Sequence, residues 1–335
     1  MLLENFKNYC EKDQETTAFK GFRGLNFFGS LKFSFILLKN NRTLNKFERD
    51  CFKENACYIG PFIGEFGNFL LHIVPFLSYL YKNKIDIYYC GIANQAPFLI
   101  DDNGVSLVKE FVYLRDFFHE VKPSGNRIDY LPTDVYKIVR KFQNKSRESN
   151  IPYLDIYSDV NLYWYSYRNW QLKSRQHIFK LSNYYLDDGK KNKVVIFPRK
   201  MSTNFTQNNG GVWDYNRIGI LLSKYFEEVV FIGHPAMSES LNDLDSKNFK
   251  LDLSNDNLNV LKHCSNAKLI VSQHSGAVHV SGYTQTPLLI IYNGLPPIKG
   301  LDDTLRFRAN FPYNNADIVF NYEGIKNYCN NIDNE

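Results

Sequence analysis

The sequence lacks the short motifs that mark the commonest metal and cofactor sites. No two of its six cysteines form a C-x-x-C pair; they are Cys10, Cys51, Cys57, Cys90, Cys264 and Cys329. It contains neither an H-E-x-x-H motif nor a Cys/His cluster, so a zinc site is not indicated. No G-x-G-x-x-G follows an apolar run, which disfavours a dinucleotide-dependent dehydrogenase. We therefore expect reduced thiols, as in a cytosolic protein, and neither a metal nor a cofactor.

Long apolar runs and a strong charge are missing as well. Nowhere do about 18 uncharged apolar residues follow one another, and the first residues show no apolar run of the signal-peptide kind. The net charge of +5 over 335 residues is modest and its basic residues are scattered, so no nucleic-acid partner is expected. An anionic small substrate or an anionic membrane surface would be enough to explain it. We expect a cytoplasmic protein or one that is peripheral on the inner face of a membrane.

The clearest pattern that is present covers residues 268–293. It predicts a buried strand at 269–271, a polar turn at 272–276, a short helix at 277–283 and a second apolar strand at 288–292. Such a βαβ unit suits parallel strands that are covered on both faces. The turn would then lie at the carboxyl edge of the sheet, where open α/β folds bind ligands. Ser275 and Gly276 open the helix with a hydroxyl and bare N–H groups, which favour a phosphate.

The rest of the second half alternates strands with helices. Strands are predicted at 194–197, 229–232 and 249–253, and helices at 213–226, from about 236 and at 255–264. This alternation predicts a doubly wound parallel sheet. A last helix is predicted at 322–331. The polar, charged run at 187–193 comes directly before the first of these strands and is the predicted domain boundary.

The first half has one informative stretch, residues 57–82. A short strand leads into a loop with Gly60, Gly64 and Gly67, whose backbone can approach a ligand, and an amphipathic helix follows. Pro75 within the helical pattern implies a kink or a late helix start. A strand is predicted next at 85–91. Helices are predicted at 105–118 and 133–144, and an aromatic run covers 161–170.

Residues 1–55 mix phenylalanine with lysine and arginine. The simpler interpretation is an N-terminal extension that packs as a cap on the next domain. The alternative is that residues 19–42 make a peripheral contact with an anionic membrane, with the aromatic side chains at the level of the headgroups. The sequence leaves both open.

The turn at 275–279 and its surroundings resemble the heptosyltransferase group (family 9) of the GT-B glycosyltransferases. Members of that family carry a Ser-Gly-x-x-His turn with a Thr-Pro after it, matched here by Ser275, Gly276 and His279 and by Thr286 and Pro287. Residues 196–200 correspond to the family's strand-end phosphate loop, Trp213 to the Trp that opens its next helix, and residues 67–75 to its Gly-Asp loop and following Pro. The resemblance covers about 55–95 and 192–293, and only the turn is specific.

The resemblance implies an α/β fold of the GT-B kind, with two Rossmann-like domains whose parallel sheets face a central cleft. Residues 56–186 would form the acceptor-side domain and residues 192–320 the domain that binds the nucleotide-sugar. Residues 1–55 would precede them. The C-terminal helix, in 321–335, is expected to return to the first domain.

The resemblance also implies a function: inverting, metal-independent transfer of a hexose or heptose from a nucleotide-sugar to a glycan or lipid-linked acceptor, in surface polysaccharide or lipopolysaccharide synthesis. Eight residues would bind the donor: Arg199, Lys200, His234, His274, Ser275, Gly276, Ala277 and His279. Arginine offers a diphosphate bidentate contact and lysine a point charge. One of His274 and His279 would equally fit a core histidine.

The catalytic base is where the chain departs from the family. The family's catalytic Asp is replaced by Asn68, which lies beside Gly64 and Gly67 in the loop near the expected cleft. Glu65 in the same loop and His72 one helical turn later are the nearest ionisable groups. We expect Glu65 to act as the base of the transfer, with His72 as the alternative. Glu65 would equally fit a charge that stabilises a helix N-terminus.

Three alternatives stay open. His234 and Pro235 resemble the His-Pro of sialyl- and Kdo-transferases, which use CMP-linked donors. A pyruvyltransferase or a non-catalytic sugar-binding protein would keep the same fold. Asp243 and Asp245 spell the D-x-D by which GT-A transferases hold a cation, but they lie in a charged stretch that is typical of solvated surface.

Overall fold

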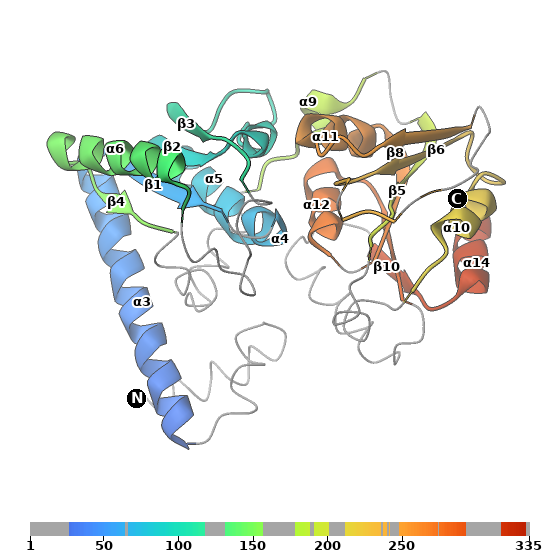
Figure 1. Cartoon of the computed structure of the whole chain (residues 1–335), viewed down its shortest axis with the longest axis horizontal. Coiled ribbons are helices and arrows are strands. Elements are labelled where there is room, and N and C mark those ends of the chain that lie inside the picture. Colours follow the sequence, from blue (N-terminus) through green and yellow to red (C-terminus); the bar gives the residue numbers. More distant parts are fainter. Residues whose placement is uncertain are drawn as a thin grey trace. The chain divides into compact units, whose positions relative to one another are not determined.

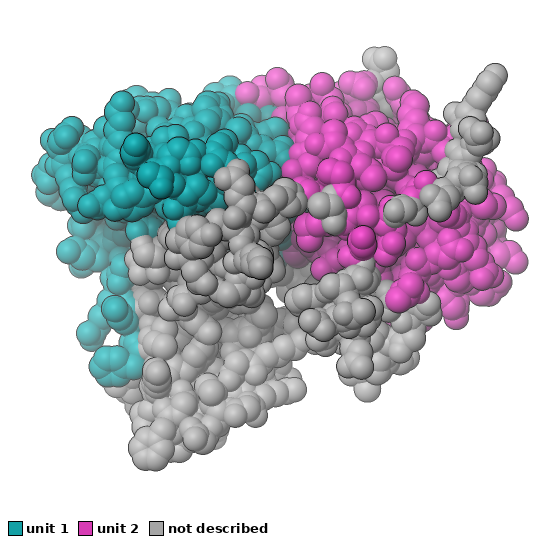
Figure 2. Space-filling model, in the orientation of Figure 1, with its two compact units in different colours: residues 1–101, 105–179 teal, residues 102–104, 180–335 magenta. Residues whose placement is uncertain are grey.

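The computed structural model describes residues 27–63, 66–117, 131–156, 178–187, 191–200, 212–235, 237–239, 241, 248–273, 275–292 and 316–332. The chain divides into two compact units, which Figure 2 shows in different colours. Residues 1–101 and 105–179 form the first, and residues 102–104 and 180–335 form the second. Within the residues described, each unit contains one parallel sheet. The predicted α/β fold with two Rossmann-like domains is thus confirmed.

The first unit is built on a four-stranded sheet with the order β3-β2-β1-β4. Its elements in chain order are α3 Phe27–Glu54, β1 Ala56–Phe62, α4 Phe66–Asn68, a π-helix Phe69–Ile73, α5 Val74–Lys82, β2 Asp86–Ile92, a 3₁₀ helix Ala93–Phe98, β3 Glu110–Leu114, α6 Thr133–Ser149 and β4 Tyr153–Leu154. All seven residues of β1 are buried, as in a central strand. Helix α6 covers one face through Val135, Val139 and Phe142.

The predicted helix at 105–118 is wrong. Residues 110–114 form β3 instead, which pairs in parallel with β2 from Tyr88 opposite Glu110 to Ile92 opposite Leu114. Strand pairing overrides the weak helical pattern here. The predicted helix at 133–144 is confirmed by α6 and extends to Ser149.

The amphipathic helix after β1 is confirmed, and its start is irregular. Residues 69–73 are π-helical, and regular α5 begins at Val74 with Pro75 in its first turn. Because proline has no N–H, it is tolerated in a first turn but breaks the pattern of hydrogen bonds before it. Pro75 therefore sets a late start, as the sequence predicts. π-Helical turns are frequent at functional sites.

The second unit contains a six-stranded sheet with the order β10-β9-β8-β5-β6-β7. Its elements in chain order are α9 Ser182–Tyr185, β5 Lys191–Phe197, α10 Tyr215–Leu222, β6 Glu228–Ile232, β7 Phe249–Asp252, α11 Asn257–Ser265, β8 Ala267–Ser272, a 3₁₀ helix Gly276–His279, α12 Val280–Thr284, β9 Leu288–Ile291, β10 Ala316–Val319 and α14 Tyr322–Ile332. All strand pairs are parallel, and numbered along the chain the order is 6-5-4-1-2-3. This is the strand order of a Rossmann fold.

The C-terminal helix does not return to the first unit, so that expectation is wrong. Ile325 and Cys329 of α14 are buried in the core of the second unit, together with Ile218 and Leu222 of α10. Figure 1 shows α10 and α14 side by side. The apolar face of α14 covers this sheet because β10, which the sequence analysis missed, brings the chain back along it.

The division between the units falls at residue 180, ahead of the boundary predicted at 187–193. The buried Asn266 amide explains the difference. Its Nδ2 donates to the Tyr185 carbonyl over 2.9 Å, and its Oδ1 accepts from the Asp187 N–H over 3.0 Å. Residues 181–187, which lead up to the polar run, are therefore held on the second unit.

The helix predicted from about residue 236 is not found among the residues described there. Ser238 instead pairs with Arg199 in an isolated antiparallel bridge. Five of the six cysteines are described, and all five are buried free thiols, as expected. Among the helices described, none has the length and apolar character needed to span a bilayer.

Candidate functional site

The second sheet changes direction between β5 and β8. From β5 the chain builds outward through β6 and β7, and then β8, β9 and β10 extend the sheet on the other side. The carboxyl ends of the two strands are level, because Phe197 pairs with Ser272. In open α/β sheets the crevice at such a switch point is where ligands bind. The sequences that follow Phe197 and Ser272 are therefore the candidate site.

The loops after β5 and β6 are joined at this edge. The Lys200 N–H donates to the Met237 carbonyl over 2.7 Å, and the Glu239 N–H donates to the Pro198 carbonyl over 2.6 Å. Arg199, which is half-buried, is thereby fixed on the same edge as His234 at the end of β6. Lys200 is exposed. The fold thus brings together the predicted donor-binding residues of two different strands.

The turn after β8 has the conformation that the sequence predicts. Ser275 caps the helical turn, since its extended backbone lets the side chain accept from the Ala277 N–H over 3.3 Å. Gly276 begins the 3₁₀ helix, which runs on into α12. Gly276 and Ala277 are half-exposed, whereas His279 is buried, which favours a packing role for this histidine. His274 lies outside the described residues.

A buried tyrosine supports both sides of the switch point. The Tyr215 hydroxyl, in the first turn of α10, donates to Gln273 Oε1 over 2.9 Å, and both residues are buried. Burial raises the pKa of Tyr215 well above its usual value, although the Arg199 backbone and charge act in the opposite direction. The hydroxyl therefore stays protonated and can donate. Sequence reasoning missed Tyr215 and Gln273; the signal was a glutamine directly after an apolar strand.

The first sheet has a switch point of its own, between β1 and β4. Behind the end of β1, Gln95 Nε2 donates to the Phe62 carbonyl over 3.1 Å, and the Tyr89 hydroxyl donates to Gln95 Oε1 over 2.9 Å. A buried tyrosine–glutamine pair thus supports the end of β1 as well. Asp155, which sequence reasoning missed, follows β4 directly and is half-buried. No sequence pattern marks it, because β4 has only two residues.

The predicted catalytic residues follow β1 in the sequence. Gly64 and Glu65 lie outside the described residues, and so does the Asn68 side chain. Gly67 is buried at the start of α4. His72 is half-buried in the π-helical turn. The choice between Glu65 and His72 as base stays a prediction, and the structure adds Asp155 to the ionisable groups near this strand edge.

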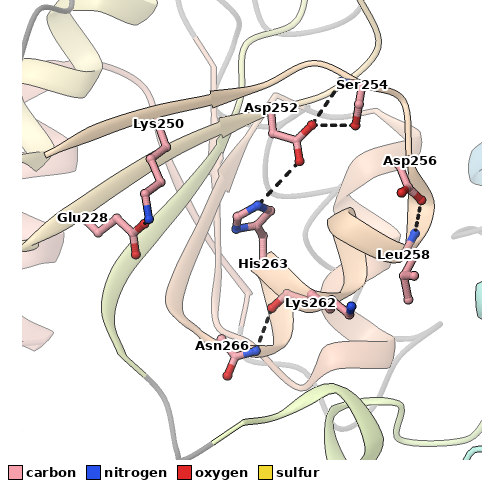
Figure 3. Close-up of polar contacts among 9 residues, drawn as sticks. All are labelled: Glu228, Lys250, Asp252, Ser254, Asp256, Leu258, Lys262, His263 and Asn266. Carbon is pink, nitrogen blue, oxygen red and sulfur yellow. Dashed lines mark hydrogen bonds and ion pairs between the residues drawn. The ribbon is translucent and has the colours of Figure 1, made fainter. Parts of the chain in front are cut away.

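A further group of ionisable side chains comes from α11, β6 and β7 of the second unit (Figure 3). His263 Nε2 lies 3.6 Å from Asp252 Oδ2, and Lys250 pairs with Glu228 over 2.5 Å. Burial and the charge of Lys193 lower the pKa of His263, against the opposing effect of Asp252 and Glu228. Although burial opposes it, hydrogen bonds from Ser254 lower the pKa of Asp252.

These shifts predict a loss of stability on mild acidification. Because the folded state lowers the His263 pKa below 6.5, the unfolded state takes up the proton first as the pH falls. The contribution of neutral His263 to the free energy of unfolding is therefore complete well above pH 6.5. It declines below this pH, by at most about 1.4 kcal/mol per pH unit. We expect His263→Gln to show a flatter decline between about pH 7 and 5 in urea unfolding. Parallel curves for the two proteins would contradict the assignment.

Within the described residues, no group of three or more His, Cys, Asp or Glu side chains could hold a metal ion. Asp243 and Asp245 lie outside those residues. Metal independence therefore stays a prediction from the sequence.

No protein-family model matches the sequence, and a search of curated proteins returns no match either. Several solved structures are similar. ADP-heptose lps heptosyltransferase II from E. coli has a TM-score of 0.48 and 13% identity over 79% of this chain and 89% of its own. E. coli heptosyltransferase WaaC with ADP has a TM-score of 0.47 and 10% identity over 83% of this chain and 98% of its own. A family 9 glycosyl transferase from Veillonella parvula has a TM-score of 0.46 and 13% identity over 80% of this chain and 86% of its own.

Heptosyltransferases are thus among the solved structures that this chain is similar to.

Proposed function

We propose that the chain is a glycosyltransferase of the hexosyl- or heptosyltransferase type, which takes its sugar from a nucleotide-sugar. One observation carries this proposal: Arg199 follows β5 and the turn with Ser275 and Gly276 follows β8, at the switch point of a Rossmann-ordered sheet. A guanidinium at one strand end and the half-exposed backbone of a helical turn at the next suit a diphosphate. The donor is therefore assigned to the second unit.

The reaction that we propose is an inverting transfer without a metal. As the bond to the sugar breaks, negative charge develops on the leaving diphosphate, and Arg199 and Lys200 would stabilise that charge. A base deprotonates the attacking hydroxyl of the acceptor, a role that we give to Glu65 of the first unit. The acceptor class that we propose is a glycan or lipid-linked sugar of surface polysaccharide or lipopolysaccharide, handled on the cytoplasmic side.

A CMP-linked donor is the second candidate. His234 lies on the same edge as Arg199, because the loops after β5 and β6 are joined by two backbone hydrogen bonds. A histidine there can donate to a single phosphate. A pyruvyltransferase or a sugar-binding protein without catalysis would use the same fold.

Thermal unfolding with UDP, ADP, GDP and CMP separates these candidates. A nucleotide at 100 times its dissociation constant should stabilise the protein by about 2.7 kcal/mol. Stabilisation by a diphosphate favours the first candidate, and stabilisation by CMP alone favours the second. Should none of the four raise the midpoint, the nucleotide-sugar proposal fails.

Replacing Gly276 with valine should weaken nucleotide binding without unfolding the protein. The added side chain would stand in the turn where the diphosphate is expected to approach the backbone. We expect an affinity loss of roughly tenfold or more in calorimetry, with Gly276→Ala as the milder control. If the unfolding midpoint collapses instead, Gly276 serves packing between strand and helix, and the ligand assignment loses its support.

A further inference from the structure

Helix α3 has one face that is buried in the first unit. Leu44, Phe47 and Cys51 are each at most 5% exposed, and their spacing of three and four residues places them on one side of the helix. The Phe47 ring lies 6.3 Å from the Phe76 ring of α5. This packing fixes the orientation of α3 about its axis, and therefore decides which side chains point outward.

The opposite side of α3 is basic. Lys39, Arg42, Lys46 and Arg49 are all exposed and follow one another at intervals of three or four residues, so they form one stripe. No ion pair links any of them to a carboxylate in the part of the chain that the structure describes. We call these four residues the basic stripe.

Apolar side chains extend the basic stripe toward the start of the helix. Phe35 is 77% exposed and Leu38 42%, and both lie on the side of the stripe. The surrounding sequence reinforces the charge, since residues 16–47 contain no Asp or Glu. A helix with this pattern is typical of segments that lie along an anionic membrane.

We propose that the chain binds an anionic membrane surface through the basic stripe, with Phe35 and Leu38 inserted among the lipid headgroups. The four cations would meet the lipid phosphates, and the two apolar side chains would leave water. The helix would lie on the membrane and not cross it, in keeping with the nine charged residues in its sequence. Charge complementarity favours a membrane over a second copy of this chain, whose own stripe would repel it.

Flotation of the full-length protein with vesicles tests the proposal. We expect the protein to bind vesicles that contain phosphatidylglycerol, to ignore vesicles of phosphatidylcholine alone and to dissociate at high salt. Each basic residue near an anionic surface strengthens binding about fivefold, so exchanging all four for glutamate should weaken it several-hundredfold. Phe35→Ser with Leu38→Ser should weaken binding roughly tenfold or more while leaving the charge unchanged.

A matched variant controls for net charge. Lys137, Lys141, Lys224 and Lys268 are exposed elsewhere, and exchanging them for glutamate changes the charge by the same amount. This variant should keep most of the vesicle binding, and both variants should keep the wild-type unfolding midpoint and nucleotide affinity. Equal loss in the two charge variants, absence of binding by the wild type, or preferential binding of nucleic acid over vesicles would each overturn the proposal. Because nucleotide affinity is measured separately, failure here is distinct from failure of the proposed function.

Discussion

Glu65→Gln is expected to lower the turnover of sugar transfer by about two to four orders of magnitude, the usual contribution of a general base. Glutamine keeps the shape of glutamate but cannot take up the acceptor proton. Nucleotide affinity should be unchanged, because the donor is assigned to the second unit. Single-turnover kinetics with calorimetry on the same samples would measure both quantities.

Two further variants test which residue acts as the base. His72 lies in a π-helical turn in which Phe69, Leu70 and Ile73 are buried. His72→Ala should therefore disturb packing and cost little in the chemical step. Asp155→Asn tests the carboxylate that follows β4 at the same sheet's switch point. Near-normal turnover in Glu65→Gln, beside an inactive but folded variant at His72 or Asp155, would transfer the role to that residue.

Arg199→Ala is expected to weaken binding of the preferred nucleotide by roughly 10- to 100-fold, since hydrogen bonds to charged groups contribute about 1.5–3 kcal/mol. The backbone at Arg199 is fixed by the bridge to Ser238, at the edge of the sheet where we expect the ligand. Arg199→Lys should recover only part of the affinity, because an ammonium cannot make bidentate contact. Titration calorimetry at constant salt measures the three proteins.

Lys200→Ala is the matched control for Arg199. Lys200 is the next residue in the chain and is exposed, so it is more strongly screened and should matter less. Since Arg199 also acts on the buried Tyr215, the unfolding midpoint of each variant has to be compared with the wild type. Equal affinity in Arg199→Ala and wild type would remove this residue from the site.

The strands of the second unit could be predicted from the sequence because they are buried on both faces. Leu269, Ile270 and Val271 are all fully buried, and such a run has few other interpretations. The strands that the sequence analysis missed lack this signal. β3 lies at the edge of its sheet and most of its side chains are only half-buried, and β4 has only two residues. Neither strand therefore carries a hydrophobic pattern of its own.

The site shows the same division between local and distant information. Ser275 and Gly276 could be predicted because capping is a local property of a few neighbouring residues. The hydrogen bond between Tyr215 and Gln273 joins residues that are 58 apart in sequence. It depends on the strand order that places β8 beside β5, which no spacing in the sequence reveals. The packing of α14 was predicted wrongly for the same reason.

A crystal structure with the nucleotide that stabilises the protein most is the measurement that tests the central claim most directly. We predict the diphosphate at the carboxyl ends of β5 and β8, with Arg199 and the turn at Ser275 and Gly276 against its oxygens. A nucleotide bound in the first unit, or elsewhere on the second sheet with Arg199 untouched, would contradict the assignment of the donor site.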